Sequence, residues 1–479
     1  MRDTKIIKLL GEVFEYFLFI ISLGFVIYGE LTKDLSVLLL ACVMLYISNT
    51  IYGLITARQN IVFLSFQVTF FTFLLGYPTI NFLFYKNYGL QFTDSIIRTV
   101  ILMMYVSQLV LIITVRMPRF LFKRKYVLIK NNNDTEIGFV DVLAKTFTIF
   151  FYVTVIFNII ETIMKIRAYY QYGYFGYYTA DLNIPTAIVK LSQMNEYFFY
   201  GICACLIKKK KIYLPVILFL GEGILTIAMG QRNQVLLRVA FVVIYFVLRS
   251  IYDKSWIEKK EKTIFLIAIP IILVFIVTYG YTRIGQNYET SGLLNTIYDL
   301  FNSQGNTCNV LAYQQFYKDN LIMNQNFTFG ELWTFVTRNV FSQFIFHTKL
   351  YSQNTIAMAQ YGHSFGQTIS YIALKSEYLA GRGYGSSYIA EVMQDYGWFG
   401  IIMINIVYGI LMKNAKFVKK NEYLVNMFIC YMIVGLIYAP RSTAIGPFMK
   451  IFSFNAILAN IIVWIVAKLI YMRGKKHNV

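Results

Sequence analysis

Long apolar stretches recur along the whole chain and are separated by polar or basic segments. Each runs for about 17 to 24 residues, which is enough to cross a hydrocarbon layer of roughly 30 Å as a helix. The stretch 264–281 (IFLIAIPIILVFIVTYGY) lacks the polar alternation of a membrane β-strand. The pattern predicts an all-α polytopic membrane protein with twelve spanning helices, near residues 14–30, 35–56, 61–84, 96–115, 143–166, 187–207, 212–229, 234–250, 263–281, 396–412, 423–438 and 448–471.

Lys and Arg gather in alternate connections between the predicted helices, which the positive-inside rule assigns to the cytoplasm together with both termini. The segment 282–395 has nearly balanced charge and is therefore expected outside, as a large folded loop. This divides the chain into a nine-helix membrane region (1–281), the loop (282–395) and a three-helix membrane region (396–479). The basic cytoplasmic connections are Arg58, 116–130, 208–211, 249–262, 413–420 and 473–476.

Composition agrees with this pattern, because 57% of the residues are hydrophobic, only 14% are charged and the mean hydropathy is +0.55. The net charge of +20 comes largely from the cytoplasmic connections, where it holds topology and contacts anionic lipid headgroups. The net charge therefore indicates a lipid bilayer as partner and does not indicate binding to nucleic acid.

Cysteine and histidine are sparse. Among the five cysteines only Cys308 lies in a polar segment, so no disulfide framework is expected. With three histidines in the chain, a zinc site is not expected, and neither a metal nor a cofactor is predicted. The first apolar run, 14–28, lacks a small-residue cleavage site and is predicted to be an uncleaved helix, so that the mature chain starts near Met1.

Four arginines are predicted at the outer ends of helices, against the usual preference for basic residues inside. The arginine fork suits bidentate binding of phosphate, so a lipid diphosphate at the outer leaflet is the ligand that the set suggests. Each residue taken alone could equally be an interfacial anchor or an ion-pair partner. The four are Arg232, Arg283, Arg382 and Arg441.

A glycine-rich segment, 381–391 (GRGYGSSYIAE), leads into the tenth predicted helix. Ser386 and Ser387 are candidate helix N-caps, and the free amides of a helix start favour an anion. Glu391 and Asp395 are four residues apart, on one helical face, and could deprotonate an acceptor hydroxyl. The alternative is that the glycines form only a turn and that Glu391 is stabilised by the helix dipole.

An aromatic loop and one histidine are further candidates on the outer side. Residues 168–178, which include Tyr174 and Tyr178, contain seven aromatic rings that could stack on sugars or form an interfacial belt. His363 could act as an external base, although a lone loop histidine can equally be without a role.

Two charged residues are predicted inside the membrane. Glu222 and Arg238 each lie about eight residues from the turn at Gly230, and hence roughly 12 Å below it on antiparallel helices. Because an unpaired charge is costly there, the two are expected to form an ion pair.

Two patches of sequence resemble the Wzy-type O-antigen and capsular polysaccharide polymerases. One is 230–237 (GQRNQVLL), similar to the family's Gly-x-Arg patch, and the other is 383–391 (GYGSSYIAE) with 395–400 (DYGWFG). The long outer loop before the third-last helix is also similar. The resemblance implies a GT-C-like membrane glycosyltransferase in the bacterial cytoplasmic membrane, in which Arg232 and Arg382 bind diphosphate and Glu391 lies near the acceptor.

The implied reaction moves a growing glycan from undecaprenyl diphosphate onto the sugar end of a new lipid-linked repeat unit. Arginine can stabilise the diphosphate leaving group without metal. A chain-length regulator and a flippase of the same pathway are implied as possible partners. Two alternatives stay open, a ligase that moves the glycan to a different acceptor and a non-enzymatic flippase or transporter, which would carry charges and broken helices near the membrane midplane.

Overall fold

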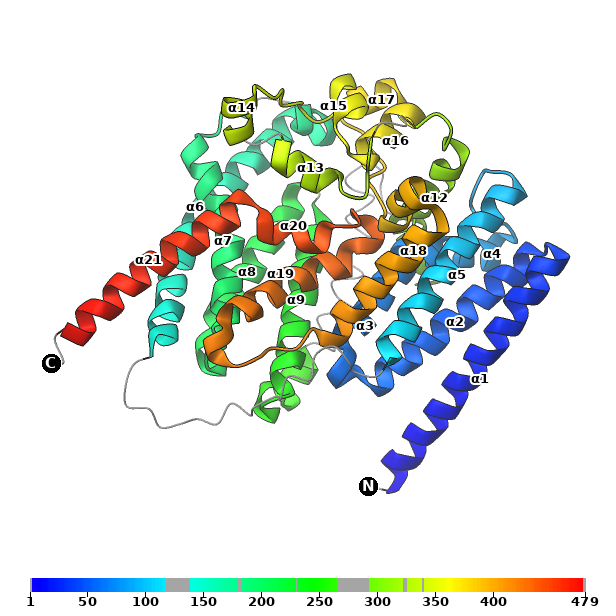
Figure 1. Ribbon diagram of the computed structural model, residues 1–479, viewed down its shortest axis with the longest axis horizontal. Coiled ribbons are helices and arrows are strands. Elements are labelled where there is room, and N and C mark those ends of the chain that lie inside the picture. The colour runs from blue at the N-terminus through cyan, green and yellow to red at the C-terminus, as the bar shows by residue number, and fades with distance from the viewer. Residues whose placement is uncertain are drawn as a thin grey trace. The chain divides into compact units, whose positions relative to one another are not determined.

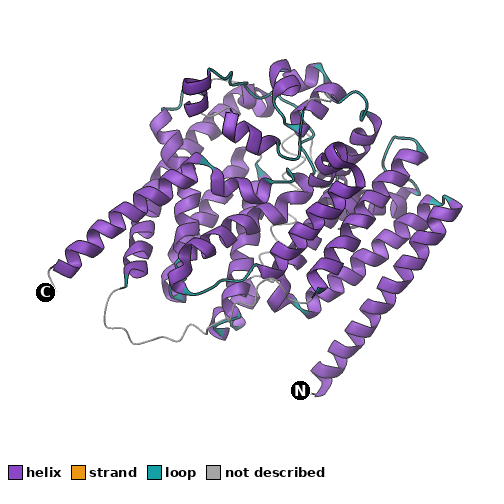
Figure 2. Cartoon of the chain, in the orientation of Figure 1, coloured by secondary structure: helices purple, strands orange, loops and turns teal. Residues whose placement is uncertain are grey.

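The computed structural model describes residues 2–117, 138–179, 182–229, 231–264, 293–321, 325–337 and 340–476. All secondary structure in these ranges is helical (Figure 2). Ten spans within them are long and apolar enough to cross a membrane, which confirms the predicted all-α polytopic fold. The spans are Lys8–Thr32, Leu35–Ile55, Ala57–Tyr85, Asp94–Arg116, Phe139–Gly173, Lys209–Met229, Asn233–Ser250, Tyr388–Asn414, Lys420–Arg441 and Phe454–Gly474.

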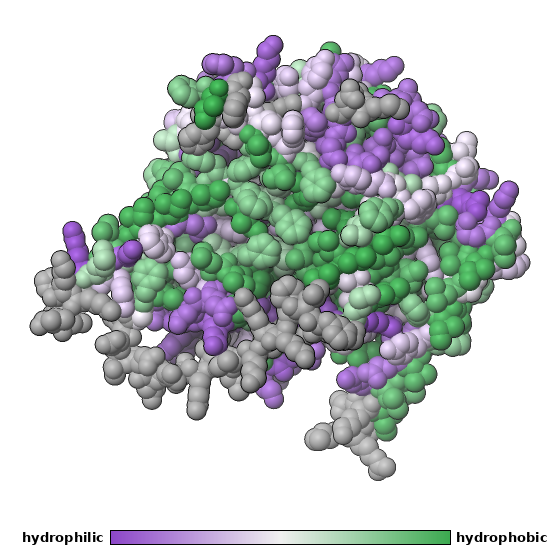
Figure 3. Space-filling model, in the orientation of Figure 1, coloured by the Kyte–Doolittle hydropathy of each residue, from purple (hydrophilic) through white to green (hydrophobic). Residues whose placement is uncertain are grey.

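The chain folds as two compact units, and the first comprises residues 1–120, 289–414 and 435–446. In this unit α1 lies along α2, and α5 packs against both α2 and α18 (Figure 1). The surface is apolar over α1 and polar over α16 and α17 (Figure 3). Its helices are α1 (Arg2–Thr32), α2 (Leu35–Ile55), α3 (Ala57–Phe70), the π-helix η1 (Phe71–Leu75), α4 (Gly76–Tyr85), α5 (Asp94–Arg116), α11 (Leu293–Gln304), α12 (Thr307–Phe316), α13 (Gly330–Thr337), α14 (Val340–Phe346), α15 (Ile356–Tyr361), α16 (Phe365–Leu374), α17 (Ser376–Leu379), α18 (Tyr388–Asn414) and η5 (Ala439–Arg441).

The second unit comprises residues 121–288, 415–434 and 447–479. Here α7 packs along α6, and α21 packs against both of them. A residue of α19, Asn426, donates a hydrogen bond to the carbonyl of Ala204 at the end of α7. The helices are α6 (Phe139–Thr179), α7 (Thr186–Ala204), α8 (Lys209–Leu225), η2 (Thr226–Met229), α9 (Arg232–Ser250), η3 (Lys254–Trp256), η4 (Lys420–Glu422) and α21 (Phe454–Lys476), together with α20 (Gly446–Phe452) except for its first residue, and α19 (Tyr423–Tyr438) is divided between the units.

The helix α7 is present where the sequence predicts a span at 187–207, but it is too polar to count as a candidate span. It joins α6 and α8, which are both candidate spans. Its polar side chains meet the region of α20 and α21: Lys450 Nζ donates to Glu196 Oε1 at 2.7 Å and Asn455 to Gln193 at 2.8 Å. These contacts explain how a polar helix is kept between two apolar ones.

Two predicted spans differ from the observed helices, and a third is not tested. Of the span predicted at 263–281, residues 265–281 lie outside the described residues. The helix predicted at 448–471 is broken, because α20 ends at Phe452 and α21 begins at Phe454. The helix predicted at 396–412 begins earlier, at Tyr388, and contains a glycine with non-helical backbone angles.

That glycine, Gly397, has φ 60° and ψ −147° and makes the chain turn back on itself within α18. In a straight helix, residues 388 and 408 would be roughly 30 Å apart at 1.5 Å per residue. In the structure their rings lie 5.1 Å apart, and the Tyr388 hydroxyl donates to Asn405 Oδ1 at 3.1 Å. The segment 388–396 therefore lies against the segment 398–414.

Candidate functional site

Glu391 lies on the folded-back segment of α18 and is completely buried, with 0% of its surface exposed. Its two carboxylate oxygens accept hydrogen bonds from different parts of the first unit. The Ser386 hydroxyl donates to Oε1 at 2.6 Å, and the backbone N–H of Ala444 donates to Oε2 at 2.8 Å. The carboxyl group thus connects the glycine-rich segment to the turn that follows η5.

The turn at Ala444 is held from a second side as well. The hydroxyl of Tyr408, also on α18, donates to the Ala444 carbonyl at 2.6 Å, and Tyr408 is itself 0% exposed. Both polar backbone groups of Ala444 are therefore bonded to side chains of α18. Buried backbone away from regular helix needs such partners.

The expected capping of α18 by its serines is wrong. Ser387 precedes the helix and its carbonyl accepts the Glu391 N–H, but its hydroxyl is buried without a hydrogen-bond partner among the described residues. The Ser386 hydroxyl is used by the Glu391 carboxylate instead of by a helix amide. Ser386 follows Gly385, which has φ 77°, and its hydroxyl lies beside the carboxylate.

Asp395 and His363 meet at one segment of the predicted outer loop. Asp395 Oδ2 accepts from the backbone N–H groups of Phe327 at 2.9 Å and Thr328 at 2.6 Å. His363 Nδ1 lies 3.4 Å from the Asn326 carbonyl oxygen, and the imidazole interacts electrostatically with Asp395. The structure brings these two predicted site residues together, and Asp395 holds the start of the segment that leads to α13.

The two arginines whose side chains are described have different surroundings. Arg382 is exposed and forms an ion pair with Glu377 at 2.5 Å. Arg441 is half-buried at the end of η5, where Nη1 lies 3.4 Å from the Gln304 carbonyl oxygen and the guanidinium lies 5.4 Å from the centre of the Phe73 ring. Each arginine is only three or four residues from a residue that bonds Glu391.

The remaining predicted site residues cannot be placed by their side chains. Arg283 lies outside the described residues. The backbone positions of Arg232, at the start of α9, and of Tyr174 and Tyr178, in α6, are described, but their side chains are not. Their roles stay predictions.

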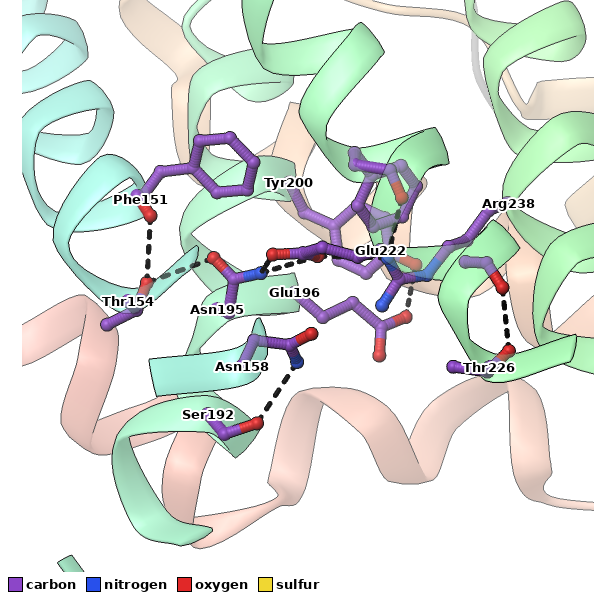
Figure 4. A network of polar contacts seen from close by, with 12 residues as sticks. Phe151, Thr154, Asn158, Ser192, Asn195, Glu196, Tyr200, Glu222, Thr226 and Arg238 are labelled. Atoms are coloured by element: carbon purple, nitrogen blue, oxygen red, sulfur yellow. Dashed lines mark hydrogen bonds and ion pairs between the residues drawn. The ribbon is translucent and has the colours of Figure 1, made fainter. Parts of the chain in front are cut away.

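The predicted ion pair in the second unit is confirmed. Arg238 Nη1 lies 2.9 Å from Glu222 Oε2, and the Glu222 side chain is 1% exposed (Figure 4). Asn195 donates to both carboxylate oxygens, at 2.6 and 2.7 Å, and Thr154 donates to Asn195. A polar network thus joins α6, α7, α8 and α9.

Sequence reasoning missed the partners of two carboxylates, Glu391 and Glu196. For Glu391 the second partner is a backbone amide 53 residues away, which no side-chain pattern reveals. For Glu196 the partner is Lys450, 254 residues away. For Glu196 the sequence gives one signal, because a charged residue within a predicted membrane helix requires a partner, but it does not say which residue that partner is.

The described residues include no group of three or more His, Cys, Asp or Glu side chains that could hold a metal ion. The candidate site of the first unit offers the buried carboxylate of Glu391, the two nearby arginine-bearing segments, His363 and Asp395.

A sequence profile described as O-antigen polysaccharide polymerase Wzy matches residues 14–474, nearly the whole chain. The chain belongs to this family. None of the curated proteins or solved structures compared with the chain matches it. The Wzy family consists of polytopic membrane proteins that polymerise O-antigen polysaccharide, so the resemblance inferred from the two sequence patches is confirmed. In this Wzy family member, the second patch contains Ser386 and Glu391, whose side chains are hydrogen-bonded to each other.

Proposed function

We propose that this protein joins oligosaccharide repeat units carried on undecaprenyl diphosphate, on the outer face of the bacterial cytoplasmic membrane. A growing glycan leaves its diphosphate carrier and is transferred to the terminal sugar of the next lipid-linked unit. The anomeric carbon–phosphate oxygen bond breaks, the acceptor oxygen forms the new glycosidic bond, and the acceptor proton passes to a base or to solvent.

The observation that best supports this proposal is the meeting of the Arg382 and Arg441 segments at Glu391. Transfer from a diphosphate requires cations that stabilise the negative charge developing on the leaving group. Arginine supplies that charge with fixed geometry. The ion pair of Arg382 with Glu377 is exposed, so an arriving phosphate can replace the carboxylate at small cost.

The face that carries α11 to α17 is proposed to be external, with both termini in the cytoplasm. The basic connection 208–211 and the basic tail after residue 472 then lie on the cytoplasmic side. An impermeant thiol reagent tests this orientation in intact cells. A cysteine introduced as Lys209→Cys should be protected until the membrane is opened, and labelling from outside would contradict the topology.

Reconstitution separates polymerase from ligase and flippase. Purified protein in vesicles is supplied with lipid-linked repeat units, and glycan length is measured on gels after release from the carrier. A polymerase produces a ladder of lengths that remain carrier-linked, a ligase requires another acceptor, and a flippase moves the substrate without lengthening it. Absence of lengthening by folded protein would refute the proposal.

The arginine roles are tested in the same assay. Arg441→Lys and Arg382→Lys keep the charge but lose the bidentate fork, so each should reduce lengthening by about tenfold or more at unchanged protein level. Arg58→Lys, in a predicted cytoplasmic connection, is the matched control. Equal activity of all three variants would remove the two arginines from the proposed site.

A further inference from the structure

The two chain segments that meet at Glu391, 382–387 and 442–445, are both non-helical. The first of them ends beside the middle of α5. The Tyr388 hydroxyl, next to the first segment, is 2.5 Å from Ser107 Oγ. Ser107 follows the first residue of α5 by 13 positions and is therefore roughly 20 Å along that helix at 1.5 Å per residue. Irregular backbone at such depth is tolerated only where protein or a water-filled cavity supplies its hydrogen bonds.

Side chains of α18 supply these bonds at Ala444 in the second segment, and in the first segment Ser370 of α16 accepts from the Tyr384 N–H at 3.0 Å. Glu391 takes one donor from each segment, Ser386 Oγ and Ala444 N–H, and Tyr408 bonds the Ala444 carbonyl. Because Gly397 turns the chain, Glu391 and Tyr408 reach the same turn although 17 residues separate them in sequence. One carboxyl group thus links the two segments directly.

The surroundings of Glu391 do not suit a general base. A base must lie within hydrogen-bond reach of the hydroxyl that it deprotonates. Glu391 is 0% exposed and both of its oxygens already accept from neutral donors, at 2.6 and 2.8 Å. Because the carboxylate is completely buried, an acceptor sugar could contact it only after the surrounding segments move.

We infer that Glu391 is a positioning residue, a clamp that fixes the Arg441 turn against the Arg382 segment and thereby holds two phosphate-binding arginines at a set separation. The inference rests on the proposed function, since it assigns the arginines to a lipid diphosphate. The two hydrogen bonds that form the clamp come from Ser386 and Ala444, and neither bond involves an arginine. Glu391 therefore acts on the substrate through the backbone of the two segments.

Replacement by glutamine discriminates between clamp and base. In Glu391→Gln the amide oxygen can still accept from Ala444 N–H and the amide nitrogen can donate to Ser386 Oγ, so both links persist. The clamp predicts lengthening within about threefold of wild type for Glu391→Gln. It predicts that Glu391→Ala, which loses both links, raises the KM for the lipid-linked repeat unit by about tenfold and lowers kcat less, per amount of folded protein.

Neighbouring serines supply a matched pair. Ser386→Ala removes one link and should raise the KM, whereas Ser387→Ala removes a buried hydroxyl that has no partner among the described residues and should leave it near the wild-type value. If Glu391→Ala fails to fold, this pair and Glu391→Gln still decide the question. Loss of lengthening by more than about a hundredfold in folded Glu391→Gln would establish a base and overturn the clamp, as would an unchanged KM in Ser386→Ala.

The wild-type reaction tests the proposed function separately. If the wild-type protein does not lengthen the glycan, the proposed function fails. The clamp can then be tested without substrate, by measuring how fast a thiol reagent labels a cysteine introduced as Ser442→Cys. The five native cysteines are buried, so background labelling is low. The clamp predicts faster labelling with Glu391→Ala than with Glu391→Gln, and equal rates would overturn it.

Discussion

Two buried carboxylates, Glu391 in the first unit and Glu222 in the second, are stabilised differently. Glu222 faces a cation, Arg238, at 2.9 Å, and the pair links two consecutive regular helices. Glu391 faces two neutral donors, and it links irregular backbone. Charge compensation therefore stabilises a helix pair in the second unit, whereas hydrogen-bond geometry fixes two segments of the first.

The largest effect is expected from removing the cation alone. Arg238→Gln leaves Glu222 buried without its charge partner, which typically costs about 3–5 kcal/mol, so the amount of folded protein in membranes should fall steeply. The double variant Glu222→Gln with Arg238→Gln should be tolerated better than either single change. Fluorescence-detected size exclusion of solubilised membranes measures this, and a double variant no better than the singles would break the pairing argument.

The two carboxylates are compared directly by the same substitution. Glu222→Gln leaves Arg238 without its charge partner, while Glu391→Gln can keep both of its hydrogen bonds. We expect Glu222→Gln to lower the free energy of unfolding by about 2 kcal/mol more than Glu391→Gln does. The apparent melting temperature should fall further for Glu222→Gln accordingly. Equal losses in a thermal-shift assay would show that charge compensation and hydrogen-bond geometry do not differ as described.

The fold-back in α18 should depend on the backbone of Gly397. At φ 60° and ψ −147° a side chain is strained even though a Cβ would meet nothing within 4 Å. Gly397→Ala should therefore cost about 1–3 kcal/mol. Gly24→Ala is the control, because a Cβ there also meets nothing within 4 Å but the backbone lies within the regular helix α1. Similar stability of both variants would argue against a fold-back held at Gly397.

A third buried carboxylate, Glu261, gives a pH effect that appears only on acidification. Burial alone would raise the pKa of Glu261, but hydrogen bonds from Lys209 and Tyr213 outweigh it and lower the pKa to about 2. The stabilisation is thus present above the ordinary glutamate pKa of 4.5 and is lost as pH falls from there toward 2. The stability difference between wild type and Glu261→Gln should stay constant from about pH 8 to 5.5 and shrink below about pH 4.5. A difference that grew on acidification would contradict the sign.

Hydrophobic length predicted most of the fold, because a membrane helix satisfies its own backbone and needs only apolar side chains. The Glu222–Arg238 pair was also predictable, since both residues lie at equal distances from one turn. These features depend on neighbours close in sequence.

The fold-back and the contacts of Glu391 could not be predicted in this way. Glycine within an apolar helix is common, so Gly397 gives no signal that distinguishes a reversal from a tolerated helical residue. The link to Ala444 uses a backbone N–H, which every residue except proline carries. Proximity of such groups is set by tertiary structure alone.

The polar side of α7 has a consequence for how the protein is made. A helix that carries Lys190 and Glu196 partitions poorly into lipid when it leaves the translocon alone. Lys450, the ion partner of Glu196, is synthesised 254 residues later. Until then α7 depends on its packing against α6, and a chain truncated before residue 450 should leave α7 incompletely inserted and open to quality-control proteolysis. Biogenesis of the second unit is therefore completed only when the last helices of the chain arrive.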